Sequence, residues 1–185
     1  MNEIVDEGRR KALLGLLAGS ATLLLPASVS AATSFWDRPR SLDLYRQATR
    51  ERATGVYWQN GGLDAVGYQR MCHVLRDVRG GTAIQMNPRL LDLLCAMQAW
   101  VSHFGFGGPI TILSGYRSPK TNANTEGAAR NSMHMYGQAA DIRFPGLPMN
   151  YLGQLAQHYA AGGVGFYVSS DFVHVDTGRI RSWRK

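Results

Sequence analysis

The sequence predicts one domain that combines helices with a sheet, and three observations support this. Residues 88–101 carry apolar side chains at helical spacing, as expected for a helix that packs on a sheet. Residues 110–113 form a β-rich run, and apolar residues alternate with polar ones in 139–144 and 172–177, which is the period of a strand. The chain has 185 residues, which is enough for one domain with a core and not clearly enough for two.

The first 31 residues have the pattern of an export signal. Arg9-Arg10-Lys11 precedes the uncharged run 12–25, and small residues follow it up to Ala31 and Ala32, where we expect cleavage. The paired arginines resemble a twin-arginine signal, which predicts export to the periplasm. An ordinary secretory signal and an uncleaved membrane anchor are the alternatives. In every case the expected membrane contact is made by this segment.

The charge balance indicates an anionic partner. The chain has 20 Lys plus Arg against 13 Asp plus Glu, and the first 31 residues hold three of each, so the excess lies in the remainder. A basic surface suits nucleic acid, acidic lipid or an acidic cell-wall polymer. The basic residues are scattered along the chain and form no run, which disfavours nucleic acid.

Residues 32–66 are polar and rich in arginine, and we expect them to form a poorly regular arm with short extended pieces around 55–58. Next, 67–78 has helical spacing and ends at glycines. In the helix over 88–101, Asn87 is the expected N-cap and Pro88 suits the first turn.

Residues 120–131 are polar and are expected to form a flexible loop. A helix is expected over 151–160 with Asn150 as its cap, followed by a last pair of strands at 164–168 and 172–176.

Cys72 and Cys95 are compatible with one disulfide if the protein is exported, or with two buried thiols. The sequence contains no C-x-x-C pattern, which excludes the common cysteine-based zinc, redox and haem-attachment motifs.

The stretch 132–141 reads S-x-H-x-x-G-x-A-x-D and holds two good metal ligands, His134 and Asp141. A fully extended chain would hold them roughly 23 Å apart, at about 3.3 Å per residue. Both can bind one ion only if the chain turns back between them, and Gly137 tolerates the backbone angles of such a turn. We therefore expect His134 on a loop and Asp141 on the strand that follows.

The two strands place their ionisable residues on one face. Side chains alternate along a strand, so Asp141 lies opposite to the apolar face of 139–144, and His174 and Asp176 lie opposite to that of 172–177. In an antiparallel sheet with one open face, these side chains and His134 can converge. An Asp–His pair on a strand is more often an ordinary surface pair, which is the alternative interpretation.

His134, Asp141 and His174 make a plausible set of three zinc ligands, which leaves a fourth position for water. Bound zinc can lower the pKa of that water to about 7. A carboxylate nearby, Asp176 or Asp171, can accept the proton and pass it to a leaving amine. Arg117 can neutralise an oxyanion or hold a substrate carboxylate.

Three motifs together resemble a known family. The stretch 132–141 with the downstream His174, the preceding Ser114-Gly-Tyr-Arg-Ser, and the closing Phe172-Val-His-Val-Asp-Thr-Gly are similar to the zinc peptidases of the D-alanyl-D-alanine peptidase and Hedgehog superfamily. Within it they resemble the MepK-like murein endopeptidase branch, which also tends to begin with a twin-arginine signal. The resemblance covers roughly residues 70–185.

The resemblance implies an α+β domain over 67–185 in which a small antiparallel sheet with flanking helices holds one catalytic zinc on its open face. It implies His134, Asp141 and His174 as ligands and Arg117 as the substrate-side cation. It also implies hydrolysis of amide bonds in peptidoglycan stem peptides or cross-links, with peptidoglycan and not nucleic acid as the partner.

One departure from the family concerns the acid/base residue. Many members place Glu three residues before the last ligand or His two before it, whereas this chain has Asp171 and Phe172 there. The MepK-like branch keeps His-x-Asp, seen here as His174 and Asp176. We therefore predict Asp176 as the main acid/base and Asp171 as the second candidate, and Asp176 as an orienting partner of a ligand is the alternative.

Two other functions remain open from the sequence. One is a non-catalytic wall-binding module that keeps zinc as part of its fold, and the other is a DD- or LD-carboxypeptidase that trims stem peptides. The complete ligand triad together with Arg117 and Asp176 favours an enzyme.

Overall fold

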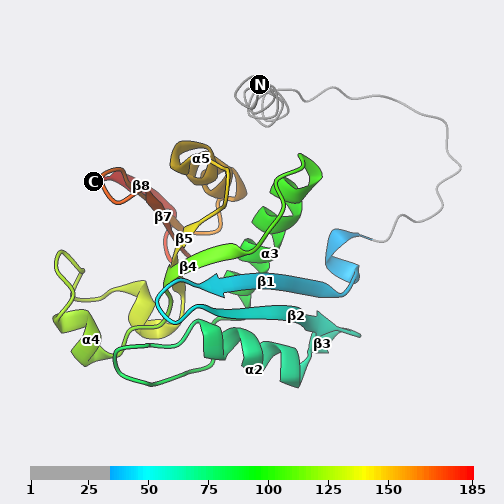
Figure 1. Cartoon of the computed structure of the whole chain (residues 1–185), viewed down its shortest axis with the longest axis horizontal. Helices are drawn as coiled ribbons and strands as arrows, with labels where there is room; N and C mark the ends of the chain where they lie inside the picture. Colours follow the sequence, from blue (N-terminus) through cyan, green and yellow to red (C-terminus); the bar gives the residue numbers. More distant parts are fainter. Residues whose placement is uncertain (1–33) are drawn as a thin grey trace, which may run out of the picture.

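A mixed eight-stranded sheet forms the frame of the part of the chain that the computed structural model describes, residues 34–185 (Figure 1). The strand order is β3-β2-β1-β4-β5-β7-β6-β8. Neighbours are antiparallel except for the parallel pairs β1–β4 and β6–β8. The strands are β1 (Arg40–Arg46), β2 (Glu51–Gln59), β3 (Gly62–Leu63), β4 (Ile110–Ser114), β5 (Ala139–Arg143), β6 (Gly163–Tyr167), β7 (Phe172–Asp176) and β8 (Arg181–Arg184). The α+β class is confirmed, but the sheet is larger than the small one expected and is not purely antiparallel.

The expected irregular arm, residues 32–66, instead supplies three strands. β1 lies inside the sheet between β2 and β4, and the extended piece around 55–58 belongs to β2. Leu42 and Leu44 are almost completely buried, while Asp43 between them is more exposed. The prediction of a poorly regular arm is wrong because a strand with one buried face needs few apolar residues, and its polar face dominated the composition.

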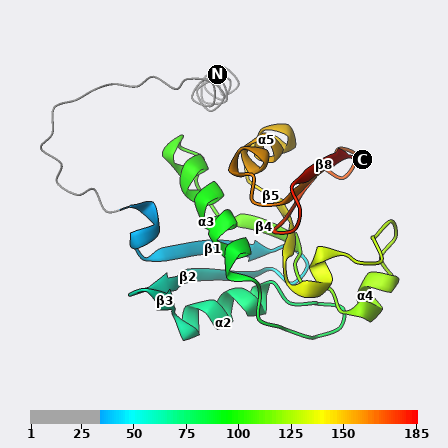
Figure 2. The same ribbon diagram turned by 180° about the vertical axis from the view of Figure 1, so that it is seen from behind.

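Three helices pack against the sheet: α2 (Ala65–Val74), α3 (Pro88–His103) and α5 (Met149–Tyr159). α2 runs along β2, α3 crosses β1, and α5 contacts β6 and β7 (Figures 1 and 2). Their apolar side chains join those of the strands in one core cluster. This burial is the main favourable term that holds the sheet in the position the site requires.

The start of α3 agrees with the prediction. The Asn87 side chain accepts a hydrogen bond from the backbone N–H of Arg89 at 2.9 Å, and Pro88 is the first helical residue. α5 differs, because it begins at Met149 directly after Pro148, without a side-chain cap. Asn150 lies inside the helix and is not its cap, since Pro148 already defines the turn that enters it.

Two other segments are more structured or shorter than expected. α2 ends at Val74 and not at residue 78, because Asp77 draws the chain into a turn by accepting the N–H groups of Arg79 and Gly80 at 3.0 Å each. The expected loop 120–131 is preceded and partly replaced by a short helix, α4 (Pro119–Ala123). Ser118 caps α4 through the N–H of Thr121.

Cys72 on α2 and Cys95 on α3 are buried free thiols. Of the two alternatives that the sequence left open, the structure therefore has the thiols and not the disulfide. Cys72 Sγ accepts a hydrogen bond from the backbone N–H of Met86 at 3.3 Å, so this thiol has a polar partner within the core.

The predicted export signal, 1–31, lies outside the described residues. Within residues 34–185, no helix is both long enough and apolar enough to span a membrane.

Candidate metal centre

His134 is brought to the sheet by a tight turn. It lies on a short 3₁₀ helix, Met133–Tyr136, which Ser132 caps and which ends at Gly137 with φ of 65°. This left-handed conformation suits glycine, and it lets the chain reverse into β5, as the sequence predicted. His134 is 1% exposed, and its Nδ1 lies 2.6 Å from the carbonyl oxygen of Gly115.

Asp141 and His174 face each other across two paired strands. β5 and β7 are antiparallel, and Asp141 is directly opposite His174 in their register. Their neighbours Ile142 and Val173 belong to the core cluster on the other face. The alternation inferred from the sequence is therefore present, and it puts both side chains beside His134.

Three candidate ligand atoms form a closed triangle in this place. His134 Nε2 lies 3.2 Å from Asp141 Oδ1 and 3.1 Å from His174 Nδ1, and the last two atoms are 3.0 Å apart. All three residues are buried. Bonds of roughly 2.0–2.1 Å at tetrahedral angles hold ligand atoms about 3.3 Å apart, so the triangle is close in size to one around a zinc ion.

The hydrogen-bond partners also fix which ring nitrogens are free. A carbonyl oxygen can only accept, so His134 Nδ1 donates to Gly115 and Nε2 keeps its lone pair. His174 Nε2 donates to Asp176 Oδ2 at 3.0 Å, so Nδ1 keeps its lone pair when the ring is neutral. Three atoms with lone pairs then point at one another, which is an arrangement that a bound cation would satisfy.

Ionisation of the three groups is consistent with a site for positive charge. Burial lowers the pKa of His134 and outweighs the attraction of Asp141. Burial also opposes charge on His174, but the hydrogen bonds of Asp141 and Asp176 prevail and raise its pKa. Burial likewise disfavours charge on Asp141, yet the two histidines hold its pKa far below the usual range. A proton and a metal ion thus compete for the same lone pair on His174.

Asp176, predicted as the main acid/base, is fully buried and surrounded by donors. Its Oδ2 accepts from His174 Nε2 and from Arg181 Nη2 at 2.6 Å, and its Oδ1 accepts from Arg181 Nη1 at 3.2 Å. The backbone N–H groups of Gly163 and Gly178 also donate to Oδ1, each at 2.9 Å. With five donors on two oxygens, the geometry matches an orienting partner of His174.

Asp171, the second acid/base candidate, is exposed in the turn before β7, with φ of 48°. Its carbonyl oxygen accepts Arg143 Nε at 2.7 Å. The residue lines a neighbouring hollow together with Arg143 and is not among those that line the cavity around the three ligands.

Arg117 is in contact with a ligand. Its Nη2 donates to Asp141 Oδ2, its Nε donates to Ser114 Oγ at 2.8 Å, and its backbone N–H donates to the carbonyl of His134 at 3.2 Å. The guanidinium therefore holds the Asp141 carboxylate from the side opposite to the histidines. It also lines the cavity, where a bound molecule could reach it.

The three candidate ligands line a cavity of about 380 Å³, which we call the metal chamber. Sequence reasoning missed the part of its lining that comes from the C-terminal end of the chain and from the loop after α4. These side chains are Glu126, Arg181, Trp183 and Lys185. The Trp183 ring lies 5.3 Å from the His174 ring, above Gly165, where any Cβ would clash with it. β8 has only four residues, too few for a periodic signal to reveal it.

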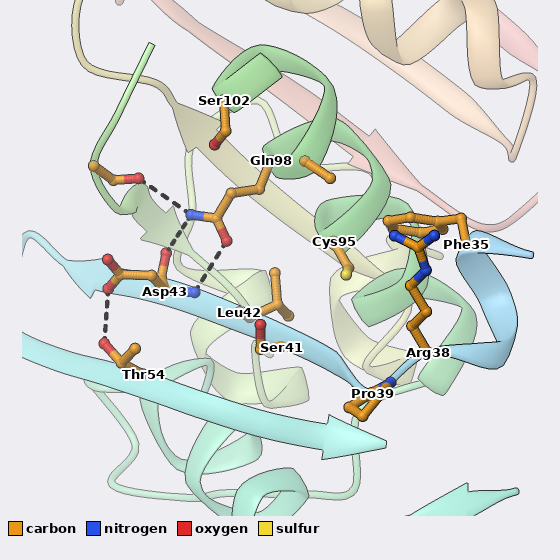
Figure 3. A pocket seen from close by; sticks show the side chains of 12 residues that line it. Phe35, Arg38, Pro39, Ser41, Leu42, Asp43, Thr54, Cys95, Gln98 and Ser102 are labelled. Atoms are coloured by element: carbon orange, nitrogen blue, oxygen red, sulfur yellow. Dashed lines mark hydrogen bonds between the residues drawn. The ribbon is translucent and has the colours of Figure 1, made fainter. Parts of the chain in front are cut away.

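A second cavity of about 440 Å³, which we call the Gln98 hollow, lies between the 3₁₀ helix Phe35–Asp37, β1 and α3 (Figure 3). Gln98 Oε1 accepts the N–H of Asp43 at 3.0 Å, and its Nε2 donates to the carbonyls of Asp43 and Gly108. The Asp43 carboxylate in turn accepts from Arg52 and Thr54. The Gln98 amide and the Asp43 carboxylate are thus paired with protein groups, and the described residues that line this hollow include no cluster of His, Cys, Asp or Glu comparable to the metal chamber.

Comparisons with known proteins agree with this geometry. The family model described as peptidoglycan L,D-endopeptidase MepK matches residues 34–183. The protein of that name in Escherichia coli K12 is 35% identical over 184 residues, covering 96% of this chain and 98% of the relative. A probable peptidoglycan L,D-endopeptidase MepK of Haemophilus influenzae is 34% identical over 97% of both chains. The zinc D-Ala-D-Ala carboxypeptidase of Streptomyces albus G is 38% identical over 78 residues, 40% of this chain and 30% of the relative.

Proposed function

Because the chain belongs to the family of the peptidoglycan L,D-endopeptidase MepK, we propose that it is a zinc peptidase that hydrolyses amide bonds in peptidoglycan cross-links. The observation that carries the proposal is the buried triangle of His134 Nε2, Asp141 Oδ1 and His174 Nδ1, open to a cavity with a cationic lining. Three protein ligands are the number found in catalytic zinc sites, in contrast to the four of closed structural sites.

His134, Asp141 and His174 are the residues that would hold the zinc ion. When bound, zinc supplies a Lewis acid that polarises a carbonyl and acidifies a water molecule. The support for zinc is the donor set of two imidazoles and one carboxylate, together with the zinc carboxypeptidase among the relatives.

The surrounding residues would keep these ligands in place. The Gly115 carbonyl holds the tautomer of His134, and Asp176 holds that of His174. We assign Asp176 to this orienting role and not to proton transfer, because its five donors and complete burial leave no oxygen facing the substrate. Arg117 would fix Asp141 and, from the chamber wall, attract a carboxylate or oxyanion of the substrate.

The proposed bond lies between an L-centre and a D-centre, following the name of the relatives. Peptidoglycan peptides can be cross-linked from D-alanine to diaminopimelate or between two diaminopimelates. The second type has this stereochemistry, because the L-centre of one residue is joined to the nitrogen on the D-centre of the other. A cross-link through D-alanine joins two D-centres. Arg117, Arg181 and Lys185 line the chamber and are complementary to the free carboxylates of such peptides.

The proposed location is the periplasm, where the family's substrate lies, with residues 1–31 as a twin-arginine export signal and cleavage near Ala31 or Ala32. The role there would be the growth or remodelling of the cell wall.

Digestion of purified cross-linked muropeptides tests the function. The zinc-loaded protein is expected to convert dimers joined through two diaminopimelates into monomers, and a chelator is expected to stop the reaction until zinc is restored. Mass spectrometry identifies the bond that is lost. Release of single terminal residues from monomers would indicate a carboxypeptidase, and binding of the dimers without cleavage would indicate a wall-binding module.

A further inference from the structure

A buried arginine without a hydrogen-bond partner for two of its nitrogens lies next to the metal centre. Arg46 is the last residue of β1 and lies on the same face of the strand as the core residues Leu42 and Leu44. Only 5% of it is exposed. Its Nε and Nη1 atoms are buried and have no acceptor among the described residues. An unsatisfied buried donor destabilises a fold, and more so when it is charged, so such a group is usually retained for a reason.

Arg46 lines a cavity of about 350 Å³, which we call the arginine chamber. This chamber shares Arg117 and Asp141 with the metal chamber, together with Thr125 and Phe172. The two chambers therefore meet at the ion pair between Arg117 and Asp141. A group that enters the arginine chamber lies beside the proposed reaction centre.

The two carboxylates in the arginine chamber are already engaged. Asp77 Oδ1 accepts the N–H groups of Arg79 and Gly80, and its Oδ2 accepts the N–H of Ser118 at 2.9 Å. Asp141 is held by Arg117 and by the two histidines. Neither acid is hydrogen-bonded to the unpaired nitrogens of Arg46.

Arg46 nevertheless keeps its charge. Burial lowers the pKa of its guanidinium to about 10, helped by repulsion from Arg76 and Arg117 and opposed by attraction to Asp141 and Asp77. The group therefore remains a cation at neutral pH. A planar guanidinium with free N–H donors binds a carboxylate through two parallel hydrogen bonds.

We propose that Arg46 and Arg117 form a carboxylate-binding subsite for the diaminopimelate whose D-centre supplies the nitrogen of the cleaved bond. This proposal rests on the proposed function, which provides the substrate. The D-centre keeps its own free carboxylate on the same carbon that bears that nitrogen. A cation pair beside the metal centre is complementary to this carboxylate and would place the amide bond against the ligands.

Kinetics with matched substrates test the subsite. The probes are three forms of one cross-linked peptide dimer: the free acid, a carboxamide at the D-centre carboxylate, and a carboxamide at the glutamate α-carboxylate. For the unmodified zinc-loaded protein, amidation at the D-centre is expected to lower kcat/KM by about 10- to 100-fold, the loss of one or two charge-assisted hydrogen bonds. Amidation at glutamate is expected to have little effect, and the reverse order would overturn the assignment.

Arg46→Met is expected to lower kcat/KM about 10- to 100-fold for the free acid but to leave the value for the D-centre amide within about threefold. Arg89→Met is the control, because Arg89 is exposed on α3 and lines neither chamber. Arg46→Lys keeps the charge without the planar fork, so it should retain only part of the preference. If Arg46→Met does not fold, the Lys variant decides, and an unchanged preference there would refute the subsite.

A binding measurement separates this inference from the proposed function. Calorimetric titration of the chelator-treated protein with a diaminopimelate tripeptide, as acid and as D-centre amide, needs no hydrolysis. If the zinc-loaded protein cuts no cross-link but Arg46→Met weakens binding of the acid alone, the function is wrong and the subsite stands. If cross-links are cut and Arg46→Met binds and cuts acid and amide like the unmodified protein, the subsite is wrong and the function stands.

Discussion

The Gln98 hollow and the metal chamber are of similar size but differ in how their polar groups are satisfied. In the Gln98 hollow, the amide of Gln98 makes three hydrogen bonds to the backbone of β1 and of the chain before β4. In the metal chamber, one carboxylate oxygen and two ring nitrogens lie 3.0–3.2 Å from one another. The first arrangement is complete within the protein, whereas the second is one that a bound cation would complete.

Two residues of β1 show the same difference in how polar groups are paired. Its first half contributes Asp43, whose carboxylate and backbone are fully paired, to the Gln98 hollow. Its last residue, Arg46, lines the arginine chamber and keeps two buried nitrogens without an acceptor. Unsatisfied buried groups are costly, and their concentration at one end of the sheet indicates where function was favoured over stability.

The largest effect is expected from substitution of a proposed metal ligand. His134→Ala is expected to reduce hydrolysis of cross-linked muropeptides by more than about 100-fold, since even partners outside the ligand set cost 10- to 100-fold. The measurement is the initial rate together with the zinc content of the purified protein. His103→Ala, at an exposed histidine on α3, is the matched control and should change neither.

The same two variants can be compared with the unmodified protein by thermal unfolding with and without zinc. Zinc in roughly 1,000-fold excess over its dissociation constant should stabilise the unmodified protein by about 4 kcal/mol, and this gain should be lost in His134→Ala. Equal stabilisation of both proteins by zinc would mean that the ion binds elsewhere.

Asp176→Asn should have the next largest effect. The amide keeps the size of the side chain but turns one acceptor into a donor that faces the N–H groups of His174 and Arg181. We expect zinc affinity to fall by about 10- to 100-fold, with hydrolysis largely restored at saturating zinc. Activity that stays low at full zinc occupancy would instead assign proton transfer to Asp176. Asp43→Asn, which changes an arginine-bound carboxylate of the Gln98 hollow, is the control.

Gln98→Leu tests the other cavity. The change leaves the N–H and carbonyl of Asp43 and the carbonyl of Gly108 without their side-chain partner. Denaturant unfolding should show a loss of about 1–3 kcal/mol in the free energy of unfolding, with zinc content and kcat/KM unchanged. A loss of activity without a loss of stability would contradict a purely structural role for this hollow.

Asp171→Asn is expected to have the smallest effect. The side chain is exposed outside the metal chamber, asparagine tolerates the left-handed backbone at this position, and the carbonyl that binds Arg143 remains. Rates of muropeptide hydrolysis should change by less than about threefold, as for other surface substitutions. A 100-fold decrease in the hydrolysis rate would instead support Asp171 as the acid/base residue.

The sequence by itself determined the parts of this protein that depend on local periodicity and turn chemistry. Asn87-Pro88 and the apolar stripe after it define α3, and Gly137 with the alternation in β5 and β7 brings His134, Asp141 and His174 together. These features were readable because side-chain direction follows from a residue's position within a single strand or helix.

Only the tertiary structure decided how the remaining residues are used. β1 and β8 are defined as strands of the sheet by parallel pairing with β4 and β6, which do not adjoin them in the sequence. The burial of Asp176 among five donors and of Arg46 without acceptors depends on segments from several parts of the chain. The physical reason is that satisfaction of a polar group is a property of its three-dimensional neighbours, which neither spacing nor composition records.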